Sequence, residues 1–303
     1  MSSPEEAPPF TLRQLSYLVA VAEAGTFTAA AERLHVSASA LSLALDELER
    51  ALGVQLTVRR RAHGVRLTAA GADTLRRARH LLRDAGELVG DAGGGSGVAG
   101  TVQLGCFPTL APAVLPGLLT RFAAAHPRAR VDFAEADQDV LTRRLRDGEL
   151  DLALLYDHDL DPALATRRIT SNTPYLLLPG SHRLAGRGPV RLRALADEPM
   201  VLFDLPPASA HLTTVLRAAG VAPWVAHRTT SVELARALVG AGLGWTVLAQ
   251  RAPSGGTAAA QVGAVVEVAL ADDPPPLEVV LATARAVAPG PAARAFAEVA
   301  HDP

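Results

Sequence analysis

The stretch GTFTAAAERLHVSASALSLALDELERALG, residues 25–53, predicts two helices joined by a tight turn. Apolar residues recur at three- and four-residue spacing in both: Phe27, Ala30, Ala31 and Leu34 in the first, and Leu41, Leu45, Leu48 and Leu52 in the second. Thr26 is placed to cap the first helix, and either Ser37 or Ser39 to cap the second. Gly53 is placed to end the second helix. This order of features is typical of a helix-turn-helix.

The flanking residues favour a DNA-binding domain over a purely structural pair of amphipathic helices. Upstream, residues 10–24 place apolar side chains on one helical face: Leu12, Leu15, Leu18, Val19 and Ala22. Downstream, residues 56–59 and 64–67 predict two short strands around a turn at residues 62–64. A third helix and a two-stranded wing are what a small helix-turn-helix domain needs to complete its core.

Positive charge concentrates on the predicted wing. Arg59, Arg60, Arg61, His63 and Arg66 all lie there. Residues 11–70 hold seven arginines against five acids, so the domain as a whole is only slightly basic. We therefore expect the attraction for DNA phosphates to come from this local cluster.

From residue 10 through VRLTAAG at residues 65–71, the chain resembles the winged helix-turn-helix of LysR-type transcriptional regulators, and the resemblance continues to the C-terminus. It implies that the domain binds double-stranded operator DNA as a dimer and that the rest of the chain senses a small molecule. A dimer of dimers is equally compatible with the resemblance.

The departures from the family fall where the second helix would meet DNA. The family commonly has Ser-Gln-Pro-Ala and then Ser-Arg-Gln, whereas this chain has SASA at residues 37–40 and SLA at residues 42–44. Thr57 and Val58 also replace the aromatic and acidic residues usual in the wing. Base reading by amide and guanidinium groups would be thin, so we expect phosphate contacts and DNA shape to contribute more. The expected DNA-binding residues are Thr28, Ser37, Ser39, Ser42, Arg59, Arg60, Arg61 and Arg66.

Residues 69–91 predict a long helix capped by Thr68. A two-heptad seam runs along it: Leu75, Ala78, Leu82, Ala85 and Val89. We expect this seam to form the dimer contact, and the alternative is a helix packed on its own domain.

The expected fold class is α/β: an N-terminal winged helix-turn-helix, a linker helix, and a two-lobed effector domain like the type 2 periplasmic binding proteins, which the family resemblance implies. After GGGSG at residues 93–97, alternating strands and helices predict a parallel sheet with right-handed crossovers. The expected boundaries are a disordered lead-in at 1–10, the DNA-binding domain at 11–68, the linker helix at 69–92, a flexible linker at 93–100, and the effector domain at 101–303, with lobe I at 101–166 and 285–303 and lobe II at 167–284.

Ligands of such sheets bind beyond the carboxyl ends of the strands, where helix N-termini offer free N–H groups. The residues expected there are Cys106, Phe107, Pro108, Thr109, Gln138, Phe203, Asp204, Thr230 and Ser231. Helix N-termini beside an apolar wall would suit a small organic anion with an apolar or aromatic body.

No residue set points to catalysis, to a cofactor or to a metal site. Ser181 and His182 have no acid placed by sequence, and no phosphate-binding or dinucleotide-binding loop is present. Contiguous residues 157–159, Asp-His-Asp, are expected to form a loop and to bind no metal. For Cys106, the one cysteine, the sequence favours a small buried apolar residue, and the alternative is a redox sensor. We therefore expect the protein to be no enzyme.

The remaining properties fit a cytoplasmic regulator. The chain has 303 residues, 49% of them hydrophobic, which is enough for two or three domains with real cores. Residues 1–10 lack the apolar core of a secretion signal, and no apolar run reaches membrane-spanning length. The alternative function is a solute-binding protein of periplasmic-binding fold, against which the missing signal and the helix-turn-helix both argue.

Overall fold

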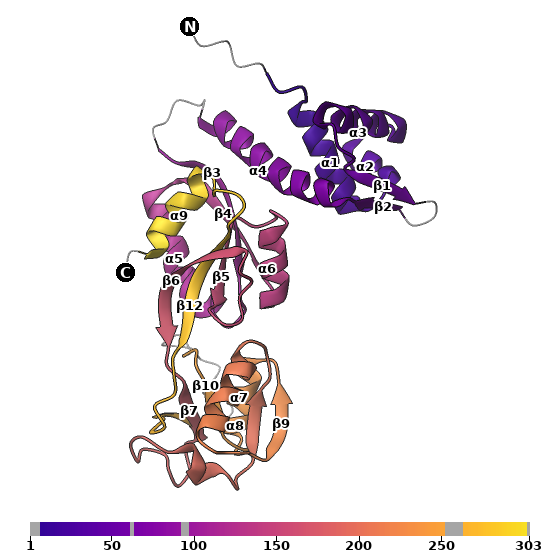
Figure 1. The fold of residues 1–303 in the computed structure, drawn as a ribbon. Helices are drawn as coiled ribbons and strands as arrows, with labels where there is room; N and C mark the ends of the chain where they lie inside the picture. The colour runs from indigo at the N-terminus through magenta and orange to yellow at the C-terminus, as the bar shows by residue number, and fades with distance from the viewer. Residues whose placement is uncertain (1–6, 61–63, 92–96, 252–262, 302–303) are drawn as a thin grey trace.

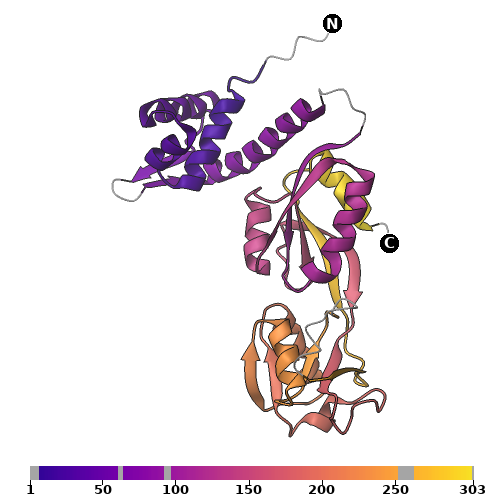
Figure 2. The same ribbon diagram turned by 180° about the vertical axis from the view of Figure 1, so that it is seen from behind.

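The computed structural model describes residues 7–60, 64–91, 97–251 and 263–301. Figure 1 shows an elongated arrangement in which the N-terminal domain and helix α4 lie at one end, and the effector domain continues as two lobes in line. The view from behind shows the same order, with the C-terminus on the lobe nearer α4 (Figure 2). We call the N-terminal domain the head, the nearer lobe lobe I, and the farther lobe lobe II.

The head contains α1 (Leu12–Ala24), α2 (Phe27–Leu34), α3 (Ala38–Leu52), β1 (Thr57–Arg60) and β2 (Gly64–Leu67). The predicted caps are confirmed: the Thr26 hydroxyl accepts from Ala29 N at 3.1 Å, and the Ser37 hydroxyl accepts from Ala40 N at 3.1 Å. Gly53 ends α3 in the left-handed conformation, with φ of 69°. Of the two serines offered by the sequence, Ser37 is the N-cap.

The wing is fastened to the helices by backbone contacts and one carboxylate. Glu49 on α3 accepts through one oxygen from Leu56 N and Thr57 N at 2.8 Å and from the Thr57 hydroxyl at 3.1 Å. Val65 N donates to Gly25 O at 2.8 Å. Gly64 has φ of +76°, and a Cβ there would lie 2.5 Å from Gly25 O, so the wing can lie this close only with glycine.

Helix α4 (Ala69–Asp91) packs on the head through part of the predicted dimer seam. Leu75 and Ala78 are buried in the head core with Leu18 and Leu45, and Leu82 packs against the same core. The prediction that Leu75 and Ala78 meet a second chain is therefore wrong, because their side chains already lie inside this one. The large apolar side chains that α4 leaves exposed among its described residues are Leu81 and Leu88, at 46% and 72%.

Lobe I is built on a five-stranded sheet in the order β4-β3-β5-β12-β6. The strands are β3 (Ala99–Cys106), β4 (Arg128–Glu135), β5 (Leu152–Tyr156), β6 (Leu164–Asn172) and β12 (Leu277–Ala284). Strand β3 runs parallel to β4 and β5, as predicted, whereas β12 is antiparallel to β5 and β6. The sheet is thus mixed.

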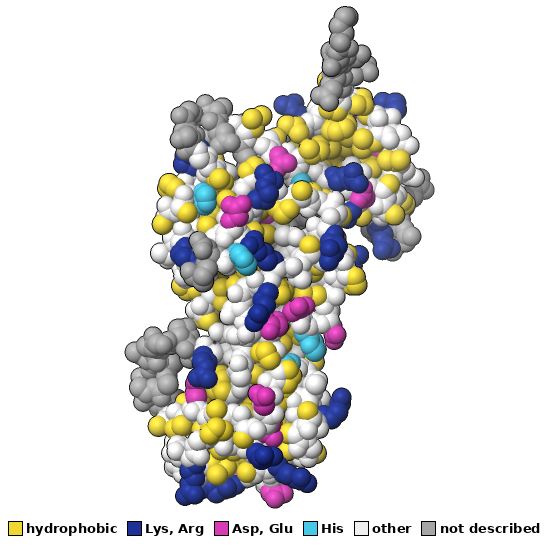
Figure 3. All heavy atoms as spheres, turned by 60° about the vertical axis from the view of Figure 1, so that its left-hand side comes forward, with side chains coloured by type: hydrophobic (Ala, Val, Ile, Leu, Met, Phe, Trp, Pro, Cys, Tyr) yellow, Lys and Arg dark blue, Asp and Glu magenta, His cyan; other side chains and the backbone are white. Residues whose placement is uncertain are grey.

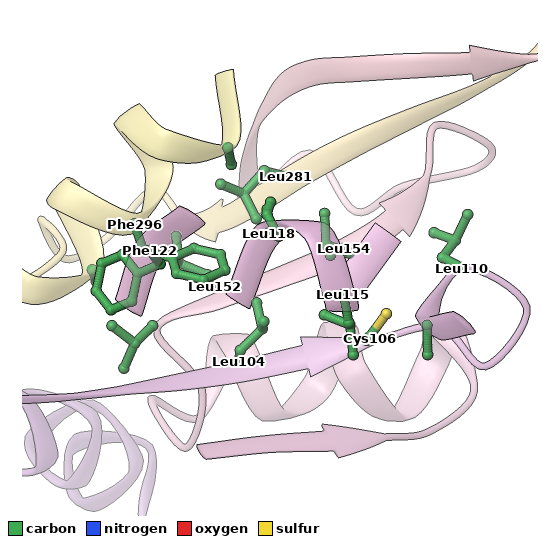
Figure 4. Packing of buried hydrophobic residues seen from close by; sticks show 14 of the residues in the cluster. Leu104, Cys106, Leu110, Leu115, Leu118, Phe122, Leu152, Leu154, Leu281 and Phe296 are labelled. Atoms are coloured by element: carbon green, nitrogen blue, oxygen red, sulfur yellow. The ribbon is translucent and has the colours of Figure 1, made fainter. Parts of the chain in front are cut away.

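Helices cover both faces of this sheet. Helices α5 (Ala111–Ala125) and α9 (Pro291–His301) share one face, where the rings of Phe122 and Phe296 lie 5.1 Å apart (Figure 4). Helix α6 (Gln138–Arg146) packs on the other face through Leu141 and Leu145. Alternate residues of β5 and β12 belong to the two cores.

The lobe boundary differs from the one expected. The boundaries expected from sequence place residues 167–172 and 277–284 in lobe II, but β6 and β12 pair along their whole length, from Leu277 opposite Asn172 to Ala284 opposite Leu164. Both strands therefore belong to the lobe I sheet, and the chain leaves that sheet only after residue 172. The hydrophobic pattern alone cannot show which sheet a strand joins.

Lobe II contains two small sheets, in the orders β10-β7-β11 and β8-β9. Its elements are β7 (Tyr175–Pro179), a 3-10 helix (Leu192–Leu195), β8 (Met200–Phe203), α7 (Ala208–Ala218), β9 (Val225–Thr229), α8 (Val232–Gly240), β10 (Thr246–Leu248) and β11 (Val265–Ala269). The fully buried Trp245 and Met200 lie in its core.

Candidate DNA-binding surface and effector cavity

Helix α3 presents a weakly polar face to solvent at its N-terminal end. Leu41, Leu45 and Leu48 point into the head core and are at most 1% exposed. On the opposite side Ser39 and Ala40 are exposed, and Leu43 is 58% exposed. The Ser37 and Ser39 hydroxyls lie 3.1 Å apart. Thr28 is exposed on α2, and Ser42 is half-buried.

The wing pairs Val58 with Arg66 and Arg59 with Val65. Arg66 is exposed, which a phosphate contact requires. For Arg59 and Arg60 the structure gives the backbone alone, and Arg61 lies outside the described residues. The basic wing thus stays a prediction from sequence.

On one face of the molecule, charged side chains of both signs are mixed. On the face shown in Figure 3, arginine side chains lie scattered over the head and the effector domain with acids between them, while apolar side chains gather at the upper end, over the head. This agrees with a formal net charge of −2. On that face the described arginines form no single broad basic patch.

Three arginines on one face of α4, which we call the arginine clamp, hold lobe I. Arg76, Arg79 and Arg83 each donate to a backbone carbonyl at or just after the end of α6: Arg146 O at 3.3 Å, Asp147 O at 2.7 Å and Gly148 O at 3.0 Å. Carbonyls at a helix C-terminus lack partners within the helix and favour cations. The arginine clamp on α4 therefore supplies hydrogen-bond donors to the carbonyls at the C-terminal end of α6 in lobe I.

Carboxylates complete this joint. Arg79 lies 3.4 Å from Glu149 of lobe I and 3.6 Å from Glu23 of α1, so one guanidinium spans the head and the lobe. Arg83 lies 2.9 Å from Asp151, whose side chain is 5% exposed. Burial raises the pKa of the Asp151 carboxyl, and Arg83 opposes that rise.

Two further features fit α4 closely to lobe I. Burial, together with the charges of Arg83 and Arg76, lowers the pKa of His80 to about 4. Its Nδ1 lies 2.9 Å from Arg83 Nη2, which suits a neutral imidazole as acceptor. Gly148 has φ of +68°, and a Cβ there would lie 3.0 Å from Arg76 O, so a larger residue would press on α4.

A small cavity of about 30 Å³ lies between the two lobes. A buried water needs at least about 10 to 15 Å³ by this measure, so the cavity has room for only two or three water molecules. It is lined by Thr109, Tyr156 and Leu277 of lobe I, and by Pro174, Phe203, Ala208, His211, Leu212, Val215, Val232, Val247, Leu248, Ala249 and Gln250 of lobe II. The Thr109 and Tyr156 hydroxyls lie 2.9 Å apart.

Two of the nine predicted effector residues, Thr109 and Phe203, line this cavity. Cys106 and Phe107 instead lie in the core of lobe I, both 0% exposed, because the end of β3 turns them inward (Figure 4 shows Cys106). Burial, and to a smaller extent Glu135, raises the pKa of the Cys106 thiol to about 12. The interpretation of Cys106 as a buried apolar residue is confirmed.

The two helix N-termini offer fewer free N–H donors than expected. Pro108 has no N–H group, and the Ser231 N–H already donates to the Thr229 hydroxyl at 3.0 Å. The Ser231 hydroxyl caps α8 by accepting from Leu234 N at 3.2 Å. Thr230 is exposed and is not among the lining residues. The expected anion site at these two helix starts thus loses most of its donors.

Gln138 and Asp204 have partners within the protein. The Gln138 amide donates to His158 O at 2.9 Å and accepts from Tyr156 N at 3.1 Å, so it ties α6 to the end of β5. Asp204 pairs with Arg228 at 3.1 Å on the surface of lobe II. Neither side chain lines the small cavity.

A second, open groove of about 700 Å³ also lies between the lobes. Lobe I contributes α6 and residues 158–162, and lobe II contributes Pro206, Pro207 and Ala210. Arg146 in this groove is paired with Asp161 at 3.0 Å. Gln138 also lines this groove, so the predicted effector residues divide between two spaces.

Sequence reasoning missed the apolar lining residues other than Phe203, and among the polar ones it missed Tyr156, His211 and Gln250. Tyr156 ends β5 beside β3, and the rule that placed Thr109 at a strand end could have found it. His211 lies in the first turn of α7 and bonds Pro275 O at 3.0 Å, and Gln250 follows β10. No local pattern marks these two.

Residues with chemistry outside these sites have structural roles. His182 lies 2.6 Å from Glu198, an acid that the sequence had not placed, and its other nitrogen accepts from Leu184 N at 3.2 Å. With both nitrogens bonded, His182 fastens a turn. Among the described residues no cluster of three His, Cys, Asp or Glu could hold a metal ion. In the same part of the chain, no helix is long and apolar enough to span a bilayer.

Two family models match the chain. The model for the bacterial regulatory helix-turn-helix protein of the lysR family matches residues 12–72, and that for the LysR substrate binding domain matches residues 95–302. Among curated proteins, the chain is similar to a probable hydrogen peroxide-inducible genes activator of Mycobacterium leprae, with 36% identity covering 80% of this chain and 78% of that protein. It is also 33% identical to the HTH-type transcriptional regulator IlvR of Caulobacter vibrioides, covering 88% and 90%.

Solved structures give the same result. HinK, a LysR family transcriptional regulator from Pseudomonas aeruginosa, is 34% identical and covers 97% of this chain and 98% of its own, with a TM-score of 0.64. The C-terminal domain of a probable LysR family regulator from Rhodococcus sp. RHA1 is 44% identical, covers 67% and 99%, and has a TM-score of 0.64.

Proposed function

Because this chain belongs to the LysR family of DNA-binding transcriptional regulators, we propose that it represses or activates genes by moving its heads when a small molecule binds between its effector lobes. The observation that carries this proposal is the difference between the two joints of lobe I. The arginine clamp ties lobe I to α4 and the head, whereas the joint with lobe II contains a cavity.

The proposed DNA contacts come from the start of α3 and from the wing. Ser39 and the exposed N-terminal face of α3 would enter the major groove, and Ser37 and Thr28 would meet phosphates at its edge. Arg59, Arg60, Arg61 and Arg66 would bind the phosphates beside it. These assignments rest on position in the fold and on side-chain chemistry.

We propose a dimer, or a pair of dimers, in which α4 meets a second chain through Leu81 and Leu88. These leucines are seven residues apart and therefore lie on one face of the helix, which is turned away from the buried Leu75. This contact replaces the predicted seam, and it leaves the clamp face of α4 in contact with its own lobe.

The effector proposed is a small, mostly apolar molecule with a hydrogen-bonding group. Among the described residues lining the small cavity none is Arg or Lys, and its polar groups are the Thr109 and Tyr156 hydroxyls, His211 and Gln250. Burial lowers the pKa of His211, which favours its neutral form. A neutral lining with few donors fits a carboxylate poorly, so the organic anion expected from sequence gives way to a less charged ligand.

Binding would have to part the lobes. A space of about 30 Å³ cannot admit an organic molecule, and a ligand there must select an arrangement in which lobe II has moved. Because the clamp holds α4 to lobe I, a rotation between lobes within a dimer would change the spacing of the heads.

A response to peroxide through the Cys106 thiol is not proposed, although relatives include a probable peroxide-inducible activator. The reactive species would be a thiolate, and this thiol is 0% exposed with its pKa raised to about 12. The sequence has no second cysteine for a disulfide.

The experiment is a footprint of the full-length chain on the DNA upstream of its own gene. We expect a protected region of two related halves with centres about 10 base pairs, or a multiple of that, apart. Protection no stronger than on unrelated DNA of equal length would contradict operator binding. Analytical ultracentrifugation of the same complex gives the number of chains bound.

A further inference from the structure

We propose that Leu43 reads thymine, by packing against the C5-methyl group that each thymine presents in the major groove of the operator. The inference rests on the proposed function, because it takes α3 as the helix that enters that groove. It makes an apolar contact a source of base specificity for this protein.

The first support is the composition of the exposed face of α3. Its first two turns expose only serine, alanine and leucine side chains, and its acidic and basic residues begin at Asp46. Among these exposed side chains Leu43 alone is long enough to reach beyond the helix surface to a base edge. At 58% exposure, it is also the most exposed large apolar side chain in the described part of the head.

The second support is that the hydroxyls of Ser37 and Ser39, the exposed serines at the start of α3, already have partners. Ser37 Oγ accepts from Ala40 N at 3.1 Å, and it lies 3.1 Å from Ser39 Oγ. These bonds hold the start of the helix and leave each serine a reduced capacity to read a base. Hydrogen-bond reading by α3 is thus restricted, whereas its apolar contact surface is open.

The third support is energetic. Binding would remove from water the apolar surface of a leucine that is more than half exposed. The thymine methyl is the apolar group that the major groove presents to it. Burying a CH₂-sized group is worth about 0.8 kcal/mol, which corresponds to about a fourfold change in affinity. Helix α3 is fastened to the wing through Glu49, so Leu43 meets the groove at a fixed depth.

The test begins with selection of duplexes from a random pool by the full-length chain. In the selected site, each thymine is replaced in turn by deoxyuridine, which removes the methyl group and keeps the base pair. We expect one thymine in each half-site at which wild-type affinity falls about fourfold, and about 15-fold when both halves are changed. Wild-type affinity that no deoxyuridine alters would overturn the proposal.

The variant Leu43→Ala completes a double-mutant cycle between the leucine side chain and the thymine methyl group. It should bind the thymine duplex as weakly as wild type binds the deoxyuridine duplex, and deoxyuridine should weaken it no further. An equal loss from deoxyuridine in variant and wild type would overturn the proposal. Leu43→Gln should move the selected base from thymine toward adenine, whose N6 and N7 a glutamine amide can pair. Leu243→Ala is the matched control, because Leu243 is 43% exposed but lies in lobe II.

Failure of this inference is distinguishable from failure of operator binding. A wild-type chain that selects no sequence contradicts both. A chain that selects a sequence but ignores every thymine methyl keeps its operator and loses only the role of Leu43.

Discussion

Lobe I is joined to α4 through charged side chains and to lobe II through mostly apolar ones. At the first joint, three guanidiniums bind carbonyls and two carboxylates of residues 146–151. At the second, Leu205 and Ala249 pack on the lobe I core around a small cavity. Directional bonds fix one geometry, whereas apolar surfaces can slide or part with smaller changes in bonding. The comparison indicates which joint transmits a movement and which one makes it.

The largest expected effect is that of breaking the charged joint. Arg83→Ala leaves the buried Asp151 carboxylate without its cation, which should lower the free energy of unfolding by about 3 to 5 kcal/mol. Urea denaturation at pH 7.5 measures it. Arg77→Ala is the control, because Arg77 is 69% exposed in its pair with Asp73 and should cost at most about 0.5 kcal/mol. Equal losses of unfolding free energy in the two variants would mean that the clamp does not stabilise the fold more than a surface ion pair does.

The same joint should make stability depend on pH. The pKa of His80 is lowered from 6.5 to about 4 in the folded chain. Between these pH values the His80 imidazole is therefore mostly protonated in the unfolded chain and mostly neutral in the folded chain. Its contribution is complete above pH 6.5 and is lost as pH falls toward 4, by up to about 3 kcal/mol. His80→Asn keeps an acceptor for Arg83 and cannot titrate. Urea denaturation from pH 7.5 to 4.5 should show a smaller loss in this variant than in wild type; parallel curves would contradict the assignment.

The close fit of Gly148 to α4 can be separated from its backbone conformation. Gly148→Ala and Gly186→Ala both place a Cβ at positive φ, but at Gly186 nothing lies within 4 Å. In each variant the free energy of unfolding should fall by about 1 kcal/mol, because alanine is strained in the left-handed backbone conformation. Gly148→Ala should lose about 1 kcal/mol more, because its Cβ meets Arg76 O. Equal thermal stabilities of the two variants would mean that α4 can shift to accommodate the added Cβ with no loss of stability.

The smallest effect concerns the apolar joint. Thr109→Val keeps the shape of the cavity wall but removes the hydroxyl that lies 2.9 Å from Tyr156 OH. Effector affinity should fall by about 0.5 to 1.5 kcal/mol, with operator binding in the absence of effector unchanged. Calorimetry and gel shift measure the two. Thr120→Val is the control, since that hydroxyl bonds Pro116 O on the outside of α5. Loss of both activities would indicate a folding defect, and loss of neither would remove Thr109 from the site.

The sequence predicts local structure well and the partners of each surface poorly. Periodicity and caps located α1 to α4, because helical spacing and N-caps depend on nearby residues. Leu75 and Ala78 have the same spacing whether they pack on their own head or on a second chain, so sequence alone could not assign them. The arginines of α4 gave no signal, because their partners lie about 65 to 70 residues away along the chain.

The candidate site divides in the same way. The rule of strand ends found Thr109 and Phe203 but also offered Cys106 and Phe107, which the sheet turns inward. Which face a residue takes at the end of a strand depends on the twist and on the following turn. Gln250 reaches the cavity only through the long-range pairing of β10 with β7.

The central claim is that lobe I carries the head rigidly and that the lobes move against each other. Distances between spin labels test it without an effector, since the only native cysteine, Cys106, is buried and would not take a label. One pair, Arg77→Cys with Ala124→Cys, spans the clamp, and the other, Ala124→Cys with Arg217→Cys, spans the lobes; dilution with unlabelled chain isolates distances within one chain. We predict a narrow distribution for the first pair and a broad or divided one for the second. A first distribution as broad as the second would contradict the claim.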